Sequence, residues 1–348
     1  MTEIATIRYP LRVVALGGGT GLPQVLRGFK ALLFPEGADD PDRLVAVVTV
    51  TDEGGSSGRL RQELGVLPPG DIRNCLVALS HNEPLMARLF QARYRSGGVL
   101  EGHNVGNLIL AALAQEEGGS FLAAVRLASE VLNIQGRVYP ATPAPARIAA
   151  TLDDGSEVLG ETALARAGRA VRRLRLHPED PPATPGVVDA IRRADLVVLG
   201  PGSLFTSIIP NVLVPEIRDA LQETRACRVL YVNAMTERGE TNGFSAADHV
   251  RAVLDHAGPC LDAALVPVDE IPGDVLDRYR DEGAERVDPA DPELDGLVPL
   301  VLRRRVLRVE RKVRHDPLRC AAGALVACAS HRGGAGDAGF GRIAGGNG

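Results

Sequence analysis

Three short apolar runs in this sequence each end in a loop of glycines and small polar residues. Residues 12–16 precede GGGTG, residues 196–199 precede GPGSLFTS, and residues 228–232 precede NAMTERGETNG. Apolar runs of this length, rich in β-branched residues and closed by turn residues, predict buried strands. In an open parallel sheet the loops that follow the strands meet at one edge, where ligands bind. The pattern therefore predicts an α/β protein with a ligand cleft at the carboxyl edge of its sheet.

The first strand opens a βαβ unit. After Gly21, apolar residues recur at spacings of three and four up to Leu33, which predicts a helix with Pro23 in its first turn. Residues 44–50 (LVAVVTV) predict the next strand, and the connection between the two is expected to be right-handed. Further helices are expected at residues 73–80, 83–93, 107–115, 121–132 and 217–223, and a further strand at 263–268.

The pattern of apolar residues, prolines and glycines changes in the middle of the chain and at its end. Residues 137–186 combine alternating apolar residues, several prolines and an Asp154-Gly155 hairpin signal, which predicts an antiparallel excursion inserted in a mostly parallel sheet. Residues 1–330 are expected to form one nucleotide-binding domain. The glycine-rich tail, residues 331–348, is expected to be disordered because it lacks apolar residues to bury.

Composition excludes several classes of protein. With 39 basic and 44 acidic residues the net charge is −5, so no nucleic-acid partner is expected. The five cysteines include no C-x-x-C pair, and the histidines show no zinc-ligand spacing, which favours reduced, buried thiols. No run approaches the ~20 apolar residues of a membrane span, and the first ten residues do not form a signal peptide. We therefore expect a cytoplasmic protein.

The first glycine loop is a candidate anion site. Gly18, Gly19, Thr20 and Gly21 follow a strand and precede a helix, so backbone N–H groups and the positive helix end can meet a phosphate. A dinucleotide fingerprint is incomplete because Leu22 replaces its third glycine, and Asp52 lies well beyond the acid expected about 20 residues on. An NAD(P)-dependent oxidoreductase is thus disfavoured, and no P-loop is present.

The second loop, residues 51–59, combines acids with serines around three glycines. Asp52 and Glu53 offer hard oxygens to Mg²⁺, while Ser56, Ser57 and Arg59 could face a phosphate. The alternative is an acidic turn followed by a helix capped by one of the two serines. Both interpretations stay open.

Two more segments offer polar side chains at helix starts. Asp71 either caps a helix starting near Ile72 or serves a ligand, whereas Arg73 in the first turn opposes the helix dipole and so favours a ligand. Asn74, Asn104 and Asn107 could read a base or a sugar, although Asn104 could equally cap the helix after it. For His103 a structural hydrogen bond is the expected role.

The later loops complete the candidate set. Gly202, Ser203, Asn233 and Thr236 follow two of the predicted strands, and the Ser203 hydroxyl is expected to face phosphate because GPGS is not a nucleophile elbow. No nucleophile with a local base is evident, so no catalytic residue is assigned. The alternative catalytic set is Asp52, Glu53 and Asp71, and the alternative metal ligand is Asp52.

Taken together, the loop segments resemble the gluconeogenesis factor (YvcK) family, within the superfamily of the 2-phospho-L-lactate transferases (CofD). The matching strings are GGGTGLP at 17–23, DEGGSSGRLR at 52–61, PPGDIRN at 68–74, GHNVGNL at 102–108, GPGSLFTSIIPN at 200–211 and NAMTERGETNGF at 233–244. The resemblance implies a Rossmann-like three-layer α/β/α fold. It also implies binding of UDP-sugars, above all UDP-N-acetylglucosamine, and a role in cell shape and cell-wall homeostasis during gluconeogenic growth.

The resemblance adds three residue assignments and one departure. It matches Thr20, Tyr279 and Arg314 to family residues tied to the ligand. Many relatives carry two aspartates where this chain has Asp52 and Glu53, which weakens the inference of a Mg²⁺ site. We expect a non-catalytic nucleotide-sugar sensor that needs no cofactor, forms a homodimer and acts through a regulatory protein. The alternative is a phosphoryl-transfer enzyme that uses a nucleotide-activated donor and Mg²⁺.

Overall fold

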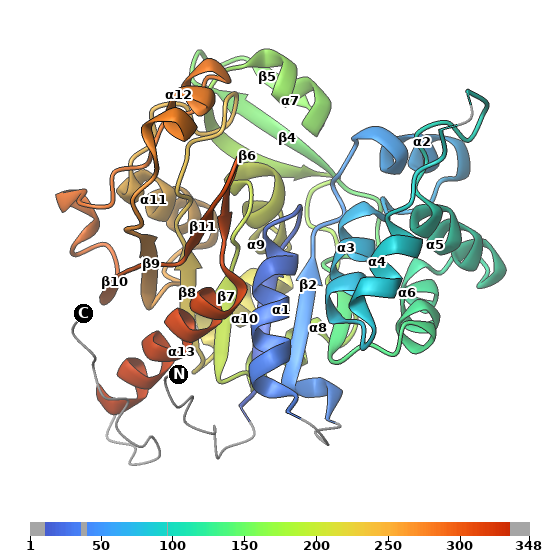
Figure 1. Cartoon of the computed structure of the whole chain (residues 1–348), viewed down its shortest axis with the longest axis horizontal. Helices are drawn as coiled ribbons and strands as arrows, with labels where there is room; N and C mark the ends of the chain where they lie inside the picture. The colour runs from blue at the N-terminus through green and yellow to red at the C-terminus, as the bar shows by residue number, and fades with distance from the viewer. Residues whose placement is uncertain (1–10, 36–39, 96, 335–348) are drawn as a thin grey trace.

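The computed structural model describes residues 11–35, 40–95 and 97–334. Within these residues, seven strands form one parallel sheet in the order β10-β9-β8-β7-β1-β2-β3 (Figure 1). Its strands are β1 (Val13–Gly17), β2 (Leu44–Val48), β3 (Arg137–Pro140), β7 (Leu196–Leu199), β8 (Cys227–Tyr231), β9 (Ala263–Pro267) and β10 (Leu300–Arg304). The predicted mostly parallel α/β fold is confirmed.

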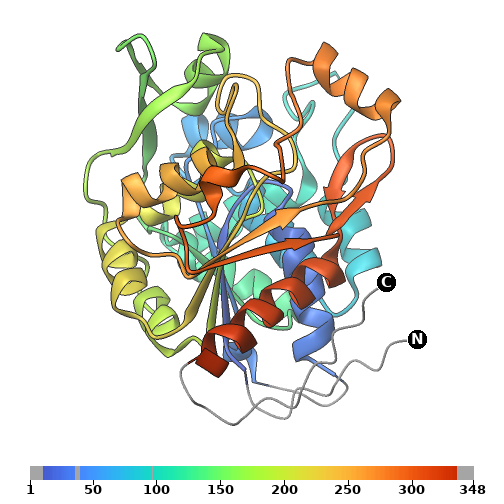
Figure 2. The same ribbon diagram turned by 90° about the vertical axis from the view of Figure 1, so that its left-hand side faces the viewer.

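Helices cover both faces of this sheet, as Figure 2 shows. Alternate residues of β1 divide between two apolar cores: Val13 and Ala15 belong to one, and Val14 and Leu16 to the other. The first core is closed by α1 (Leu22–Leu33), α3 (Gly70–Leu79), α5 (Val105–Glu116), α6 (Phe121–Val131) and α13 (Pro317–Gly334). The second is closed by α8 (Val187–Arg193), α9 (Ile209–Val212), α10 (Pro215–Glu223) and α11 (Ala246–Ala257). Strands buried on both faces read as continuous apolar runs, which is why the sequence predicts them well.

The remaining helices each contribute one buried apolar residue to one of the two cores. They are α2 (Gly55–Leu64), α4 (Glu83–Phe90), α7 (Glu161–Ala167) and α12 (Gly273–Asp281), with short helical turns η1 (Pro41–Arg43), η2 (Leu204–Ile208) and η3 (Pro292–Leu294). The helices predicted within residues 73–132 correspond to α3, α4, α5 and α6, with bounds that differ by a few residues.

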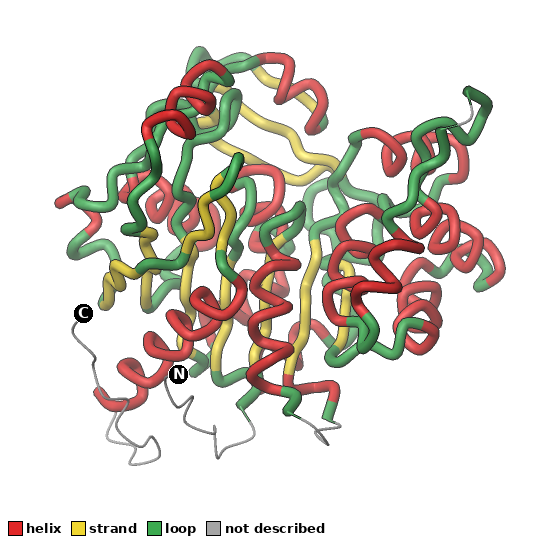
Figure 3. Tube along the Cα trace, in the orientation of Figure 1, coloured by secondary structure: helices red, strands yellow, loops and turns green. Residues whose placement is uncertain are grey.

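The antiparallel excursion starts later than predicted. Residues 137–140 form β3, which pairs in parallel with β2 and so belongs to the main sheet. The inserted sheet contains β4 (Arg147–Leu152), β5 (Glu157–Leu159) and β6 (Val171–His177), with Asp154-Gly155 in the predicted hairpin turn. Figure 3 shows this small sheet beyond the carboxyl ends of the main strands. The prediction failed at β3 because a four-residue strand next to prolines has no pattern that distinguishes it from the insertion.

The C-terminal part returns to the main body. A two-stranded hairpin, β11 (Leu307–Val309) and β12 (Val313–His315), leads into α13, which packs on α1. A Cβ on Gly28 would lie 1.9 Å from the Pro317 carbonyl oxygen, so only glycine allows this approach of the two helices. α13 continues to Gly334, so residues 331–334 of the predicted disordered tail are helical; residues 335–348 lie outside the described residues.

All five cysteines are buried and free, as expected, and burial raises the pKa of the Cys260 thiol to about 11. Among the described residues no helix is long and apolar enough to cross a membrane.

Candidate functional site

The loops after β1, β7 and β8 meet at the carboxyl edge of the sheet, as predicted. A Cβ on Gly21 would lie 2.3 Å from the Pro201 carbonyl oxygen, and Asn233 donates its side-chain N–H to the Gly202 carbonyl at 3.0 Å. β1 and β7 are neighbours, yet the chain leaves β1 toward β2 on one side and β7 toward β8 on the other. Such a change of direction is where open α/β sheets bind ligands.

Asp71 joins the first glycine loop to α3. Its carboxylate accepts the Gly19 N–H at 2.7 Å, whereas α3 begins at Gly70 after Pro69, so Asp71 lies inside the helix and does not cap it. Burial raises the pKa of Asp71 to about 6, and the Gly19 hydrogen bond opposes that shift. The N–H that the sequence suggests for a phosphate is thus occupied by a carboxylate.

The acids of the second loop point in different directions. Glu53 forms an ion pair with Arg147 of β4, and a Cβ on Gly160 would lie 2.2 Å from the Glu53 carboxylate. Asp52 accepts the Gly54 N–H at 2.7 Å and interacts with Glu161 and Asp71. Burial first, and the Asp52 charge second, raise the pKa of Glu161 to about 7. The insertion therefore contributes a carboxyl group to this edge of the sheet.

A second carboxyl pair lies in the loop that follows β8, residues 233–243, which is the third loop at this edge of the sheet. Glu240 accepts the Phe205 N–H at 3.3 Å and the Thr206 hydroxyl at 3.1 Å, which fixes the third loop to the segment that follows β7. Burial, followed by the neighbouring Glu237 charge, raises the pKa of Glu240 to about 8, and burial also raises the pKa of Glu237. Sequence reasoning missed Glu161, Glu237 and Glu240; the two in the third loop belong to the quoted string NAMTERGETNGF and could have been flagged there.

The two serines of the second loop lie inside α2 rather than at its cap. α2 begins at Gly55 after Gly54, so the capping alternative for Ser56 and Ser57 is wrong. The Ser56 hydroxyl lies 2.9 Å from His103 Nδ1 and accepts from Asn107 Nδ2 at 3.1 Å. The predicted structural hydrogen bond of His103 is therefore observed. Ser57 accepts the Gly70 N–H at 3.1 Å and so links α2 to α3.

Arg73 extends this buried network. Its guanidinium donates to Asn107 Oδ1 at 2.6 Å and to Asn74 Oδ1 at 2.8 Å. Burial, with the nearby Arg93 charge, lowers the pKa of Arg73 to about 10. In the described part of the chain, Arg73 Nε and Asn104 Oδ1 are buried without a hydrogen-bond partner. Asn104 occupies the cap position of α5 but makes no capping bond there.

Four further residues predicted for the site either bind other parts of the protein or are exposed. Arg59 donates to the Glu101 carbonyl at 2.6 Å, and Thr20 is exposed beside the first loop. Ser203 hydrogen-bonds Glu237. The Thr236 hydroxyl accepts the Glu285 N–H at 2.8 Å, so it already holds the segment that follows α12.

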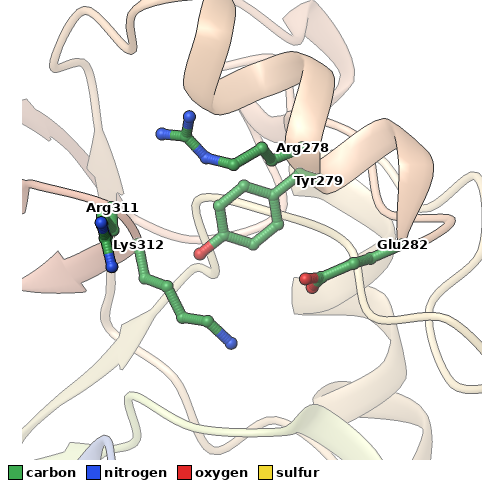
Figure 4. A pocket seen from close by; sticks show the side chains of 5 residues that line it. All are labelled: Arg278, Tyr279, Glu282, Arg311 and Lys312. Atoms are coloured by element: carbon green, nitrogen blue, oxygen red, sulfur yellow. The ribbon is translucent and has the colours of Figure 1, made fainter.

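Tyr279 and its neighbours line a pocket of about 470 Å³ between α12 and the β11–β12 turn. Its walls are Arg278, Tyr279 and Glu282 on one side and Arg311 and Lys312 on the other. In Figure 4 the Tyr279 ring projects from α12 toward Lys312. The Tyr279 hydroxyl accepts the Val313 N–H at 3.0 Å.

Arg314 lies on β12 next to this pocket but is not part of its lining. It is exposed and stands opposite Arg308 of β11.

The pocket and the glycine loops are connected through the third loop. Met235 pairs with Arg286 in an isolated β-bridge, and a Cβ on Gly283 would lie 3.0 Å from the Arg238 side chain. The helix that supplies Tyr279 is therefore anchored on the loop that supplies Asn233. No group of three or more His, Cys, Asp or Glu side chains that could hold a metal occurs among the described residues.

Comparison with known proteins agrees with this arrangement. The family described as "2-phospho-L-lactate transferase CofD" matches residues 13–303, which places the chain among the CofD-like α/β proteins. The gluconeogenesis factor of Bacillus subtilis is 44% identical over 308 residues, with 88% of this chain and 94% of that protein covered. The gluconeogenesis factor of Halalkalibacterium halodurans is 43% identical over 286 residues, with 82% and 86% covered. The chain therefore belongs to the gluconeogenesis factor (YvcK) family within the CofD-like superfamily.

A solved structure supports the same conclusion. A crystal structure of a member of the UPF0052 family from Bacillus halodurans superposes with a TM-score of 0.85 and 40% sequence identity. The match covers 90% of this chain and 99% of that one, so the Rossmann-like sheet and its additions are shared over nearly the whole molecule.

Proposed function

We propose that this protein is a cytoplasmic nucleotide-sugar-binding factor whose ligand is UDP-N-acetylglucosamine. It serves cell shape and cell-wall homeostasis during growth on gluconeogenic carbon sources, as a homodimer that acts through a regulatory protein. Membership of the gluconeogenesis factor family supports the cellular role. No cofactor is required.

The pocket at Tyr279 is the observation that carries this proposal. An aromatic ring can stack on a uracil base, and the three cations Arg278, Arg311 and Lys312 suit a diphosphate. Glu282 can accept hydrogen bonds from ribose or sugar hydroxyls. The volume of about 470 Å³ lies within the usual range for small-molecule sites.

The glycine loops contribute a second set of contacts in this proposal. The loops that carry Gly18, Thr20 and Ser203 contact each other, and the third loop connects them to the segment that follows α12. Because Asp71 occupies the Gly19 N–H, a phosphate can bind that N–H only by displacing a carboxylate. A ribose or sugar hydroxyl, which can donate to Asp71, is the easier ligand there.

A thermal-shift comparison tests the function. A ligand that binds only the folded state raises the free energy of unfolding by RT ln(1 + [L]/Kd), and so raises the melting temperature. We expect UDP-N-acetylglucosamine to raise Tm more than GDP or NAD does at equal concentration, and Mg²⁺ alone to leave Tm unchanged. A shift with NAD instead of the UDP-sugar would favour a dehydrogenase and contradict the proposal.

The second candidate is a phosphoryl-transfer enzyme that uses a nucleotide-activated donor and Mg²⁺. The position of Asp52 and Asp71 beside the first glycine loop favours it, since positioning and metal charge suffice for such chemistry. Against it, the Glu53 carboxylate is already paired with Arg147. Phosphorus NMR should find UDP-N-acetylglucosamine intact after long incubation with protein and Mg²⁺. Accumulation of UMP or UDP that Asp52→Asn stops would make the enzyme the better account.

A further inference from the structure

The β11–β12 hairpin is firmly held at its base. Asp269 accepts the N–H groups of Val306 and Leu307 at 2.7 and 3.0 Å, and the Asp316 N–H donates to the Val306 carbonyl at 2.7 Å. His315, the last residue of β12, meets the buried Tyr231 ring edge-on at 6.5 Å. The ends of the hairpin are therefore part of the rigid body of the molecule.

The tip of the hairpin, residues 308–314, is weakly held by comparison. Its two strands have three residues each and join no other sheet, and such isolated hairpins are marginally stable. Within the described residues, one hydrogen bond ties the tip to α12, from the Val313 N–H to the Tyr279 hydroxyl. Val309 and Val313 add apolar packing, so the tip has a defined position without a ligand.

The tip also carries an excess of positive charge. Arg308 stands directly opposite Arg314, and like charges in this position destabilise a strand pair. Arg311 and Lys312 lie in the turn between them, and Glu310, which pairs with Arg308, is the one acid of residues 308–314. Four cations therefore lie within the seven residues of the tip.

The pocket places a third element against these cations. Arg278 and Glu282 lie one helical turn apart on α12 and its end, and they face Arg311 and Lys312 across the pocket. Arg278 pairs with Asp274 at 3.0 Å, so the three cations exceed the carboxylates Asp274 and Glu282 by one positive charge, which favours an anion such as a diphosphate.

We propose that the tip of the β11–β12 hairpin is a strap that the diphosphate of an organic ligand locks against α12. Arg278 holds the phosphates from the helix, and Arg311 and Lys312 hold them from the tip. Binding relieves the repulsion among the tip cations and connects two elements that otherwise share one hydrogen bond. The inference rests on the proposed function, because the diphosphate is that of the nucleotide-sugar.

Amide hydrogen exchange of the full chain tests the strap, since local opening governs exchange at residues 306–316. At saturating UDP-N-acetylglucosamine, exchange at Val313 should slow by about tenfold, and pyrophosphate at millimolar concentration should slow it in the same direction. The β4–β5 hairpin at residues 152–157 provides an internal control whose exchange should not change. An Arg311→Gln/Lys312→Gln variant, measured at ligand concentrations that saturate it, should lose the slowing. An Arg192→Gln/Arg193→Gln variant, which removes two exposed cations from α8, should keep it.

Calorimetry on the same samples separates the two proposals. Binding of the UDP-sugar without slower exchange at Val313 would overturn the strap and leave the proposed function intact. Slower exchange with pyrophosphate, in a protein that does not bind the UDP-sugar, would support the strap and contradict the proposed function. Unchanged exchange with both ligands, or unchanged slowing in the Arg311→Gln/Lys312→Gln variant, would overturn the strap.

Discussion

Gly18 lies where the first glycine loop touches two other segments. A Cβ at this position would lie 2.7 Å from the Asp71 carboxylate and 2.8 Å from the Thr49 methyl group. Gly18→Ala should therefore lower the free energy of unfolding by about 1–3 kcal/mol and abolish stabilisation by the UDP-sugar, because Asp71 must move. Urea unfolding with and without ligand measures both effects. Gly98→Ala, where a Cβ meets no atom within 4 Å, is the control. Equal stability and ligand response in the two variants would contradict the role of Gly18.

Glu240 should make the stability of the fold depend on pH. Its pKa is about 8 in the folded chain, whereas an unfolded glutamate titrates near ~4.3. Between these values the folded state retains a proton that the unfolded state has lost, so stability falls as pH rises through this window. Glu161 and Asp71, with pKa values of about 7 and 6, act in the same direction.

Chemical denaturation at about pH 5.5 and about pH 8.5 checks this dependence. Glu240→Gln should reduce the loss of stability between the two, while Glu63→Gln, on an exposed side chain, should leave it unchanged. A loss of stability in Glu240→Gln equal to or steeper than that of wild type would show that the carboxyl group is not the source.

Contacts between single residues that are distant in the chain could not be predicted from the sequence. Gly18 to Gly21 could be predicted because strand, loop and helix are adjacent in the chain. The Asp71 bond to Gly19 spans 52 positions and the Glu240 bond to Phe205 spans 35, and no local pattern reports such partners. The same reason explains why Glu161 of the insertion was missed.

The N-terminal end of α11 is stabilised by side-chain hydrogen bonds that take no part in the proposed binding. α11 begins with a complete capping box, in which Ser245 accepts the Asp248 N–H at 3.2 Å and Asp248 accepts the Ser245 N–H at 2.9 Å. Ser245→Ala should cost about 1 kcal/mol of unfolding free energy and leave UDP-sugar affinity unchanged. Thermal unfolding and a titration measure the two quantities. A loss of affinity at full folding would assign α11 to the site.

Element boundaries were predictable to different degrees. The strands of the sheet centre were evident, because a run such as VVALG in β1 is buried at every residue. β3 was assigned to the insertion, since its place beside β2 depends on the order of strands in the sheet. At α2 the serines suggested a cap, but Gly54 occupies that position and the serines serve the contacts of α3 and α5.

At the scale of the whole molecule, the fold brings the glycine loops and the Tyr279 pocket to one end of the sheet, although they are far apart in the sequence. The glycine loops lie at the junction of β1 and β7, while the cations of the Tyr279 pocket come from α12 and the β11–β12 turn. The family resemblance pointed to Tyr279 and Arg314, but Arg278, Arg311 and Lys312 became candidates only through the pocket. Their proximity depends on the anchoring of α12 by the third loop.

The central claim is that the chain binds a UDP-sugar through this C-terminal region, and calorimetric titration of UDP-N-acetylglucosamine into wild type and Arg314→Ala tests it most directly. Arg314 is exposed on β12, two positions after Lys312 of the pocket, so its loss should leave the fold intact while removing a positive charge beside the proposed diphosphate site. We predict saturable binding to wild type and an affinity at least about tenfold lower, roughly 1.4 kcal/mol, in Arg314→Ala, with equal Tm of the two free proteins. Absence of binding to wild type, or equal affinity in a folded Arg314→Ala, would contradict the account.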